Sequence, residues 1–415
     1  MRALSFDVTI PRYLLARSLG RFTELATFGP LGGLRMTEVP DPGLPAEDWV
    51  RLRVLSAGIC GTDLATLSFT AATSLEPFGS FPAVPGHEIL ARVEEVGSAV
   101  RDLEPGMRVV VDPLVSCRVR GHPDGDDCPS CRTGRPGTCE MAGEDGALRI
   151  GSRALSPGLT IGYHADLPGG WGPFMVAHRS QIFPVPDELD DRSAVLVEPL
   201  SIGMHAVVNA PPEPGQDVLV IGSGPIALGT IWALRAGGFQ GTVISQAKRD
   251  HEARLARALG ADEVVAPGDE ARQALVDTGA QAYQPIVGDE VYAGGGFPLI
   301  FDCVGSPSSL SQSLRFAAPR GRIVMLGCAA TIPKLDLTFV WARELELRGF
   351  VGYGLERWRG REEHTFQITQ ELMVETRAPV RDLVTHVFPL DQFRTALSAA
   401  ANPRRSEAVK VVLEP

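Results

Sequence analysis

Four cysteines stand close together in one segment of the chain. Cys128 and Cys131 are separated by two residues, Cys139 follows after seven more, and Cys117 stands ten residues ahead. Four thiolates are enough for the closed tetrahedral site of a structural zinc ion. A chance cluster of free cysteines is the alternative, and His122 in the same segment is a possible substitute for one thiolate. Cysteine rarely lies among Asp, Gly and Arg as in HPDGDDCPSCRTGRPGTC, so the segment predicts a metal site.

A second set of metal-binding residue types is spread over three segments. Cys60 lies in GICGTD, His87 in VPGHE and Glu198 in LVEPLSIGMHA. A thiolate, an imidazole and a carboxylate leave a fourth zinc position open, as catalysis at zinc requires. A lone cysteine at a strand end is most often a core residue, and a lone His-Glu pair is most often a surface turn. Spacing alone therefore does not join the three.

A glycine-rich turn follows the apolar stretch VLVIG. Its residues are Gly222, Ser223, Gly224, Pro225 and Ile226, and a helix-like stretch begins there. Gly222 permits a tight turn, and Gly224 lets the backbone approach a pyrophosphate at the amino end of the helix. The alternative is a plain turn between a strand and a helix.

The segment after the next expected strand bears on the choice of dinucleotide. An acidic residue normally binds the ribose hydroxyls there, but residues 245–249 read SQAKR. With Gln246 in this place no carboxylate repels a 2′-phosphate, and Lys248 and Arg249 are able to pair with one. We therefore expect NADP(H) to be preferred over NAD(H), with a solvated basic turn as the alternative.

The order of expected elements indicates an α/β protein with two domains. Short apolar stretches at 218–222, 242–245, 264–265, 299–305 and 322–327 alternate with helix-like segments, which predicts a doubly wound parallel sheet over residues 201–344. Residues 1–200 contain alternating strand-like runs such as 50–58 and 89–97. After 345 the pattern is mixed again, so residues 345–415 are expected to rejoin the first domain.

Composition limits the class of partner. The chain has 415 residues and a formal net charge of −11, which opposes binding to nucleic acid or to an anionic membrane and favours a small-molecule substrate. It contains neither a long apolar run nor a signal-like start, so we expect a cytoplasmic protein. In a reducing compartment, a cluster among the seven cysteines indicates metal binding rather than disulfides.

Taken in order, the motifs resemble a known family. GICGTD, PGHE followed by VEEVGSAV, the four-cysteine segment, LVEPLSIGMHAV, GSGPIALG, DCVGSP and GRIVMLG occur as in the zinc-containing medium-chain dehydrogenase/reductase superfamily, nearest its sorbitol, threonine and glucose dehydrogenase branch. The resemblance covers most of the chain. It implies a mostly-β GroES-like catalytic domain and a Rossmann dinucleotide-binding domain.

The resemblance also implies roles for individual residues. Cys60 and His87 match ligands of the catalytic zinc, and Glu198 matches the carboxylate at or beside the metal. Glu88 matches a nearby acid, Thr62 the hydroxyl of the proton relay, and Asp63 an acid that holds His87 by a hydrogen bond. The expected cofactor site comprises the turn residues, the basic segment and two residues of the later motifs: Gly222, Gly224, Pro225, Ile226, Gln246, Lys248, Arg249, Val304 and Leu326.

Three departures from the family pattern are expected to have local consequences. The spacing between Cys117 and Cys128 is ten residues instead of two, so the cysteine lobe is expanded. The stretch between Cys60 and His87 is long and is expected to reshape the substrate mouth. The sugar-binding acid is absent. Trp171, Tyr163, Trp341 and Phe350 are candidates for pocket walls, although such residues are more often core.

These features predict an oxidoreductase, a zinc-dependent alcohol dehydrogenase or carbonyl reductase with one catalytic and one structural zinc ion. Hydride would pass between NAD(P) and a secondary alcohol, polyol or sugar-like substrate. The alternatives are an NADPH-dependent reductase of activated C=C bonds and a non-catalytic structural or binding protein that retains the fold. Family analogy and the apolar run at 323–337 predict a homodimer or homotetramer.

Overall fold

The computed structural model describes residues 1–20, 22–123, 125–327 and 331–415. By their contacts these residues divide into two compact units, each of which is considered by itself. Unit 1 comprises Met1–Glu198, Gly352–Val374 and Val384–Pro415, and unit 2 comprises Pro199–Val351 and Glu375–Leu383. Across these described ranges, no helix has both the length and the apolar character needed to cross a membrane.

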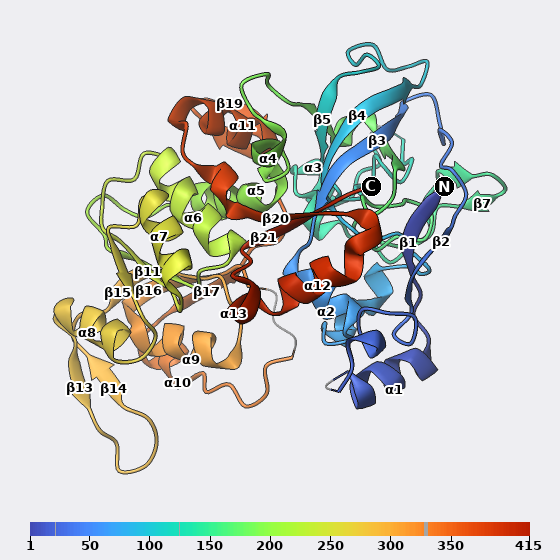
Figure 1. The fold of residues 1–415 in the computed structure, drawn as a ribbon. Coiled ribbons are helices and arrows are strands. Elements are labelled where there is room, and N and C mark those ends of the chain that lie inside the picture. Colours follow the sequence, from blue (N-terminus) through green and yellow to red (C-terminus); the bar gives the residue numbers. More distant parts are fainter. Residues whose placement is uncertain (21, 124, 328–330) are drawn as a thin grey trace. The chain divides into compact units, whose positions relative to one another are not determined.

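Unit 2 is built on a six-stranded sheet in which every pairing is parallel (Figure 1). All four residues of its central strand are buried, as expected for a parallel strand that is covered on both faces. The order reverses next to this strand, which is the doubly wound arrangement predicted from the sequence. From edge to edge the strands are β12 (Glu263–Val265), β11 (Val243–Gln246), β10 (Val218–Ile221), β15 (Phe297–Asp302), β16 (Ala317–Met325) and β17 (Glu346–Gly349).

The helices of unit 2 begin and end at recognisable residues. Pro225 occupies the first turn of α6 (Pro225–Ala236), where its missing N–H costs nothing, and Gly237 follows the last residue. Ser306 caps α9 (Pro307–Phe316) by accepting a hydrogen bond from the Ser309 amide at 3.1 Å. The other elements are α7 (Asp250–Ala258), α8 (Asp269–Asp277), α10 (Thr338–Ala342) and a separate hairpin of β13 (Gln281–Tyr283) and β14 (Val291–Ala293).

The parallel sheet continues beyond the expected boundary at residue 344. β17 pairs in parallel with β16, and Glu375–Leu383 also belongs to unit 2. All four β17 residues are exposed, as at a sheet edge, so no apolar pattern marks this strand in the sequence. The apolar run at 323–337, from which an oligomer is expected, includes residues 328–330, which lie outside the described residues.

Unit 1 is dominated by a seven-stranded, mostly antiparallel sheet. Its longest strand, β3 (Trp49–Gly58), pairs with β4 (Glu88–Val96), β8 (Phe174–His178) and β21 (Lys410–Glu414). β4 and β21 pair with β3 at its carboxyl-terminal residue Gly58, whereas β8 pairs with its amino-terminal half, Trp49–Arg53. The remaining strands of the sheet are β5 (Arg108–Val111), β9 (Ile182–Pro184) and β20 (Val384–Pro389).

Short strand pairs and several helices make up the rest of unit 1. The short strand pairs are β1 (Arg2–Phe6) with β2 (Leu34–Glu38), β6 (Arg149–Ile150) with β7 (Arg153–Ala154), and β18 (Leu355–Trp358) with β19 (Arg361–His364). The helices are α1 (Ile10–Leu19), α2 (Gly61–Leu67), α3 (Pro129–Arg132), α4 (Asp191–Ala194), α11 (Thr365–Thr376), α12 (Phe393–Ala401) and α13 (Pro403–Ser406). α5 (Val197–Asn209) starts in unit 1, and from Pro199 onward it belongs to unit 2.

Candidate functional site

Cys60 lies at the junction between β3 and α2, where it is the N-cap residue of the helix. The Asp63 carboxylate accepts a hydrogen bond from the Cys60 amide at 2.8 Å, so the third residue of the helix fixes the backbone that carries the thiol. Thr62 lies between these two residues on the first turn of α2. The GICGTD segment thus places a thiol, a hydroxyl and a carboxylate at one helix start.

His87 and Glu88 reach the same place from the start of β4. Glu88 pairs in register with Gly58 at the end of β3, and both His87 and Glu88 are buried. A Cβ atom at Gly58 would lie 1.8 Å from Oε2 of Glu88, so only glycine leaves space for this carboxylate. Ligand atoms of Cys60, His87 and Glu88 all lie within 4.8 Å of one another.

Lys410, the first residue of β21, completes this end of the sheet. Its ammonium group donates to both carboxylate oxygens of Glu88, at 2.5 and 2.7 Å, and to the carbonyl of Ile59 at 3.3 Å. Burial opposes the charged form of Lys410, but the negative charges of Glu88, Cys60 and Glu198 and the hydrogen bond to Glu88 together outweigh it and raise the pKa of Lys410 above its usual value. One of the three possible metal ligands, Glu88, is therefore also a member of a buried ion pair.

Glu198 is the second residue of α5, and its carboxylate accepts a hydrogen bond from the Tyr353 hydroxyl at 2.9 Å. Burial raises the pKa of Glu198 to about 7, although the nearby His87 acts in the opposite direction. Among the described residues, the group of possible ligands contains Glu88 and does not include Glu198. The sequence expected Glu198 as the carboxylate at or beside the metal and Glu88 as an acid nearby.

Tyr163 connects the residues expected to move and hold protons. Its hydroxyl lies 2.6 Å from Oδ1 of Asp63 and 3.1 Å from Oγ1 of Thr62, and its ring contacts the imidazole of His87 at 5.5 Å between centroids. Nδ1 of His87 is 3.3 Å from the same Asp63 oxygen. Tyr163 was expected only as a pocket wall. Its bridging position depends on packing between segments about one hundred residues apart.

The donor set fits a zinc ion. Zinc accepts sulfur, nitrogen and oxygen ligands at about 2.0–2.3 Å, which places ligands of one ion a few ångströms apart. Cys60, His87 and Glu88 offer one atom of each kind within 4.8 Å of one another, and His87 and Glu88 are buried. Three protein ligands leave the fourth tetrahedral position for a substrate oxygen.

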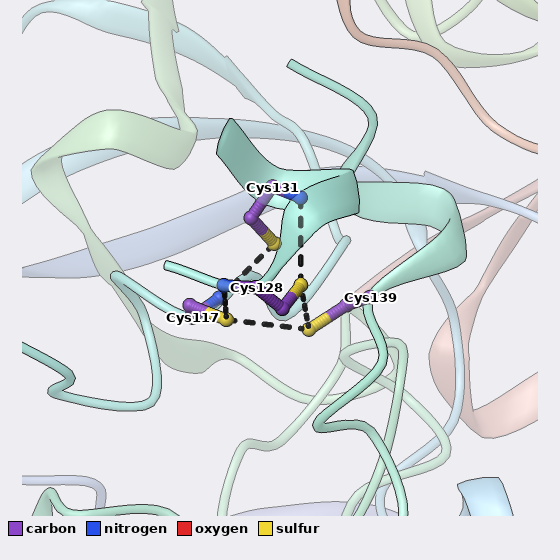
Figure 2. Close-up of side chains that lie close together, drawn as sticks. All are labelled: Cys117, Cys128, Cys131 and Cys139. Carbon is purple, nitrogen blue, oxygen red and sulfur yellow. Dashed lines mark hydrogen bonds between the residues drawn. The ribbon is translucent and has the colours of Figure 1, made fainter. Parts of the chain in front are cut away.

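The four cysteines of the expanded lobe also converge. Figure 2 shows the sulfur atoms of Cys117, Cys128, Cys131 and Cys139 facing one another, and all four lie within 4.8 Å of one another. The Cys131 hydrogen bond is the main cause that lowers the pKa of Cys139, to about 5, so one thiolate forms readily. Four thiols in this arrangement fit a tetrahedral zinc site. His122 is not in the group, and its backbone amide donates to the Cys117 carbonyl.

The ten-residue segment between Cys117 and Cys128 supplies a buried cation, Arg120. Its side chain has no exposed surface and donates to the carbonyl oxygens of Ala142, at 3.2 Å, Glu144, at 3.0 Å, and Gly158. The charge of Arg120 also lowers the pKa of Cys139, after the larger effect of the Cys131 hydrogen bond. This segment thus places a positive charge near thiols that become negative when they bind metal.

In unit 2 the predicted glycine-rich turn joins β10 to α6. Gly222 has a φ of +121°, which L-residues with a side chain rarely adopt, and a Cβ atom at Gly224 would meet nothing within 4 Å. Pro225 and Ile226 begin α6, so backbone N–H groups at the helix start border open space. This arrangement fits a dinucleotide pyrophosphate.

Other predicted cofactor residues lie at the carboxyl ends of the neighbouring strands. A Cβ atom at Gly222 would lie 3.0 Å from Cγ2 of Val304, and the Leu326 amide donates to the carbonyl of Asp302 at 2.9 Å. Gln246 ends β11 and is buried, and its Oε1 has no hydrogen-bond partner among the described residues. Lys248 is exposed, whereas Arg249 pairs with Glu252.

The other expected pocket walls do not gather at the unit 1 site. Trp171 is fully buried in the core of unit 1, whereas Trp341 is 75% exposed in unit 2. Phe350 contacts His205 within unit 2. Sequence reasoning missed Lys410 and Tyr353, and the available signal for Lys410 was a lysine that opens the otherwise apolar strand KVVL.

Two family descriptions match successive parts of the chain, with residues 188–224 between them. Residues 46–187 match the alcohol dehydrogenase GroES-like domain, and residues 225–366 match the zinc-binding dehydrogenase family. L-idonate 5-dehydrogenase of Vitis vinifera is 29% identical over 89% of both chains. Sorbitol dehydrogenase of Arabidopsis thaliana is 29% identical over 88% of this chain and 87% of its own. A zinc-binding dehydrogenase from Sinorhizobium meliloti 1021, solved bound to NADP, is 28% identical, covers 92% of this chain and 95% of its own, and superposes with a TM-score of 0.68.

Proposed function

The chain belongs to the zinc-containing medium-chain alcohol dehydrogenase family, and from this premise we propose that its unit 1 site interconverts a secondary alcohol of a polyol or sugar acid with the corresponding ketone. The protein is a zinc-dependent, NAD(P)-linked dehydrogenase. The observation that carries the proposal is the grouping of Cys60, His87 and Glu88 beside Thr62. This grouping of metal-binding residues beside a hydroxyl favours a dehydrogenase over a C=C reductase or a non-catalytic protein.

The substrate class is supported by the relatives. The Vitis vinifera protein is an idonate dehydrogenase and the Arabidopsis thaliana protein is a sorbitol dehydrogenase, so both names point to polyhydroxylated carbon chains. A screen of cofactor reduction with polyols, sugar acids and simple secondary alcohols tests the proposal. We expect turnover with at least one polyhydroxylated substrate. Turnover restricted to simple alcohols or to activated alkenes would contradict it.

The residues of unit 1 have distinct proposed roles. When bound, zinc supplies a Lewis acid for the substrate oxygen, and the nicotinamide accepts or gives the hydride. Thr62 takes up the hydroxyl proton of the alcohol as it passes its own hydroxyl proton on toward solvent, and the Tyr163 hydroxyl at 3.1 Å orients it. Asp63 accepts hydrogen bonds from Tyr163 and from the Cys60 amide, and so holds both in place. The buried positions of His87 and Glu88 limit access of water.

We propose Cys60, His87 and Glu88 as the protein ligands of the catalytic zinc, with Glu198 beside the metal. The support is the common separation of at most 4.8 Å for the first three, a group that does not include Glu198 among the described residues. Wild-type protein is expected to hold two zinc ions per chain and Cys60→Ser one. Zinc analysis of Glu88→Gln and Glu198→Gln separates the two carboxylates, because only Glu88→Gln should lose most catalytic zinc. The opposite result would assign the ligand role to Glu198.

We also propose that NADP(H) is preferred over NAD(H). No carboxylate occurs in residues 245–249, Lys248 is exposed, and the Sinorhizobium meliloti relative was solved with NADP. A charge-assisted phosphate contact contributes about 1.5–3 kcal/mol, roughly a tenfold to hundredfold preference. Dissociation constants of both cofactors test this, and Lys248→Ala and Gln246→Asp should each move the ratio toward NAD(H). A wild-type preference for NAD(H) would refute it.

A homodimer or homotetramer remains our proposal for the assembly. Its support is family analogy together with β17, an exposed edge strand of the parallel sheet that has unpaired backbone groups on one side. Sedimentation at micromolar concentrations should give a species of at least two chains. A monomer over the whole range would remove the proposal.

A further inference from the structure

Glu252 is an acidic side chain buried in the first turn of α7. It is 4% exposed, although the neighbouring Asp250 at the start of the same helix is exposed. One carboxylate oxygen accepts a hydrogen bond from the Ser223 hydroxyl at 2.6 Å, and the other accepts one from the Arg249 guanidinium. An acid near a helix amino end is electrostatically favourable, and these two partners offset the cost of its burial.

The two partners locate this carboxylate in the candidate dinucleotide site. Ser223 lies between Gly222 and Gly224 in the turn that fits a pyrophosphate, and Arg249 is the N-cap residue of α7, three residues after the end of β11. In Rossmann units these are the segments that border the pyrophosphate and the adenosine ribose. Glu252 therefore joins them from a helix, not from the strand end where a ribose-binding acid is expected.

Two buried polar atoms in the segments before and at the start of α7 have no hydrogen-bond partner among the described residues. These atoms are Oε1 of Gln246 and Nε2 of His251. Gln246 is itself 4% exposed. Buried polar atoms are normally hydrogen-bonded, so unpaired ones at the end of β11 and the start of α7 are consistent with a polar ligand that completes the network.

We infer that Glu252 is a specificity-determining residue for the cofactor, because it neutralises Arg249 and puts a negative charge where the 2′-phosphate of NADP(H) would bind. The 2′-hydroxyl of NAD(H) carries no charge and meets no such repulsion. Lys248 is then the cation that remains for the phosphate. The inference rests on the proposed binding of a dinucleotide by unit 2, but not on which dinucleotide the wild type prefers.

Glu252→Gln is the direct test, because it removes the charge and retains one oxygen that can accept from Arg249, while its amide NH₂ can donate to the Ser223 hydroxyl. Dissociation constants for NADP⁺ and NAD⁺ are measured by titration calorimetry, so no turnover is needed. We expect the ratio of the NAD⁺ constant to the NADP⁺ constant to rise at least tenfold, which corresponds to about 1.4 kcal/mol. Glu263→Gln, which removes an exposed acid from the amino-terminal end of β12, is the matched control and should change the ratio less than twofold.

Arg249→Ala provides a second test that does not depend on the folding of Glu252→Gln. It leaves the Glu252 carboxylate without its counter-charge, so NADP⁺ binding should weaken at least tenfold while NAD⁺ binding changes less than threefold. Equal losses for both cofactors in either variant would overturn the inference, because Glu252 would then only support the turn. An unchanged ratio in Glu252→Gln would also overturn it. A wild type that prefers NAD⁺ refutes the separate NADP(H) proposal and leaves this test intact.

Discussion

Replacing Lys410 by methionine tests the buried ion pair beside the candidate zinc site. The side chains of Lys410 and Glu88 are 3% and 1% exposed, and the ammonium group contacts both carboxylate oxygens. Methionine retains most of the volume of the lysine stem but removes its charge. In metal-free Lys410→Met the Glu88 carboxylate stays buried without the ammonium group that contacts both of its oxygens.

The expected loss of stability is large. Removing one partner of a buried pair costs about 3–5 kcal/mol, because the remaining charge keeps its desolvation cost. At about 2–4 °C for each kcal/mol in a unit of 150–250 residues, the melting temperature should fall by roughly 6–20 °C. Bound zinc supplies positive charge near Glu88, so the difference between wild type and variant should shrink in zinc-loaded protein.

The assay is urea unfolding of the metal-free wild type, Lys410→Met, Glu88→Gln and the double variant, and unfolding is monitored by tryptophan fluorescence. If the pair is coupled as the distances indicate, the double variant recovers at least about half of the loss of Lys410→Met, since neither charge then remains. A loss below about 1 kcal/mol in Lys410→Met would refute the reasoning. Simple addition of the two single losses in the double variant would refute it as well.

Three further predictions concern other residues of unit 1. Arg120→Gln should release zinc from the cysteine lobe to a chelator at least tenfold faster than the wild type, because it removes the buried cation. Arg132→Gln changes an exposed residue and should release zinc at the wild-type rate; equal release rates for the two variants would contradict the role of Arg120. Tyr163→Phe should lower kcat by about tenfold with KM changed less than threefold, because it removes the hydroxyl that orients the relay threonine; a loss confined to KM would instead assign Tyr163 to substrate binding. In metal-free protein, burial raises the pKa of Glu198 from 4.5 to about 7, so its contribution to stability is fully present below pH 4.5 and is lost as the pH rises to about 7. Glu198→Gln should remove this part of the pH dependence of unfolding, and an unchanged dependence would show that the group does not titrate there.

Local patterns in the sequence predicted the elements that depend on short-range physics. The buried run of β10, the turn at Gly222 and the start of α6 are contiguous, so strand, turn and helix signals support one another within about twenty residues. The same holds for the cysteine lobe, whose four thiols belong to one segment. These features needed no knowledge of tertiary contacts.

Contacts between distant segments were not predictable in this way. Lys410 is 322 residues from Glu88, and Tyr353 is 155 residues from Glu198, so their pairing depends on which strands and helices pack together. The insertion before Cys128 indicated only an expanded lobe, and the burial of Arg120 emerged from the fold. β17 was missed as part of the parallel sheet because all four of its side chains are exposed.

The most direct test of the central claim is zinc-dependent reduction of NADP⁺ or NAD⁺ by the wild type and Cys60→Ser, each assayed at the same concentration of added zinc, in the presence of the best polyol or sugar acid from the screen. Appearance of the reduced nicotinamide is followed by its absorbance. The account predicts steady turnover by wild type, loss of that turnover on chelation with recovery on added zinc, and at least a thousandfold lower rate for Cys60→Ser. Turnover by Cys60→Ser at the wild-type rate, or wild-type turnover that survives complete removal of zinc, would contradict it.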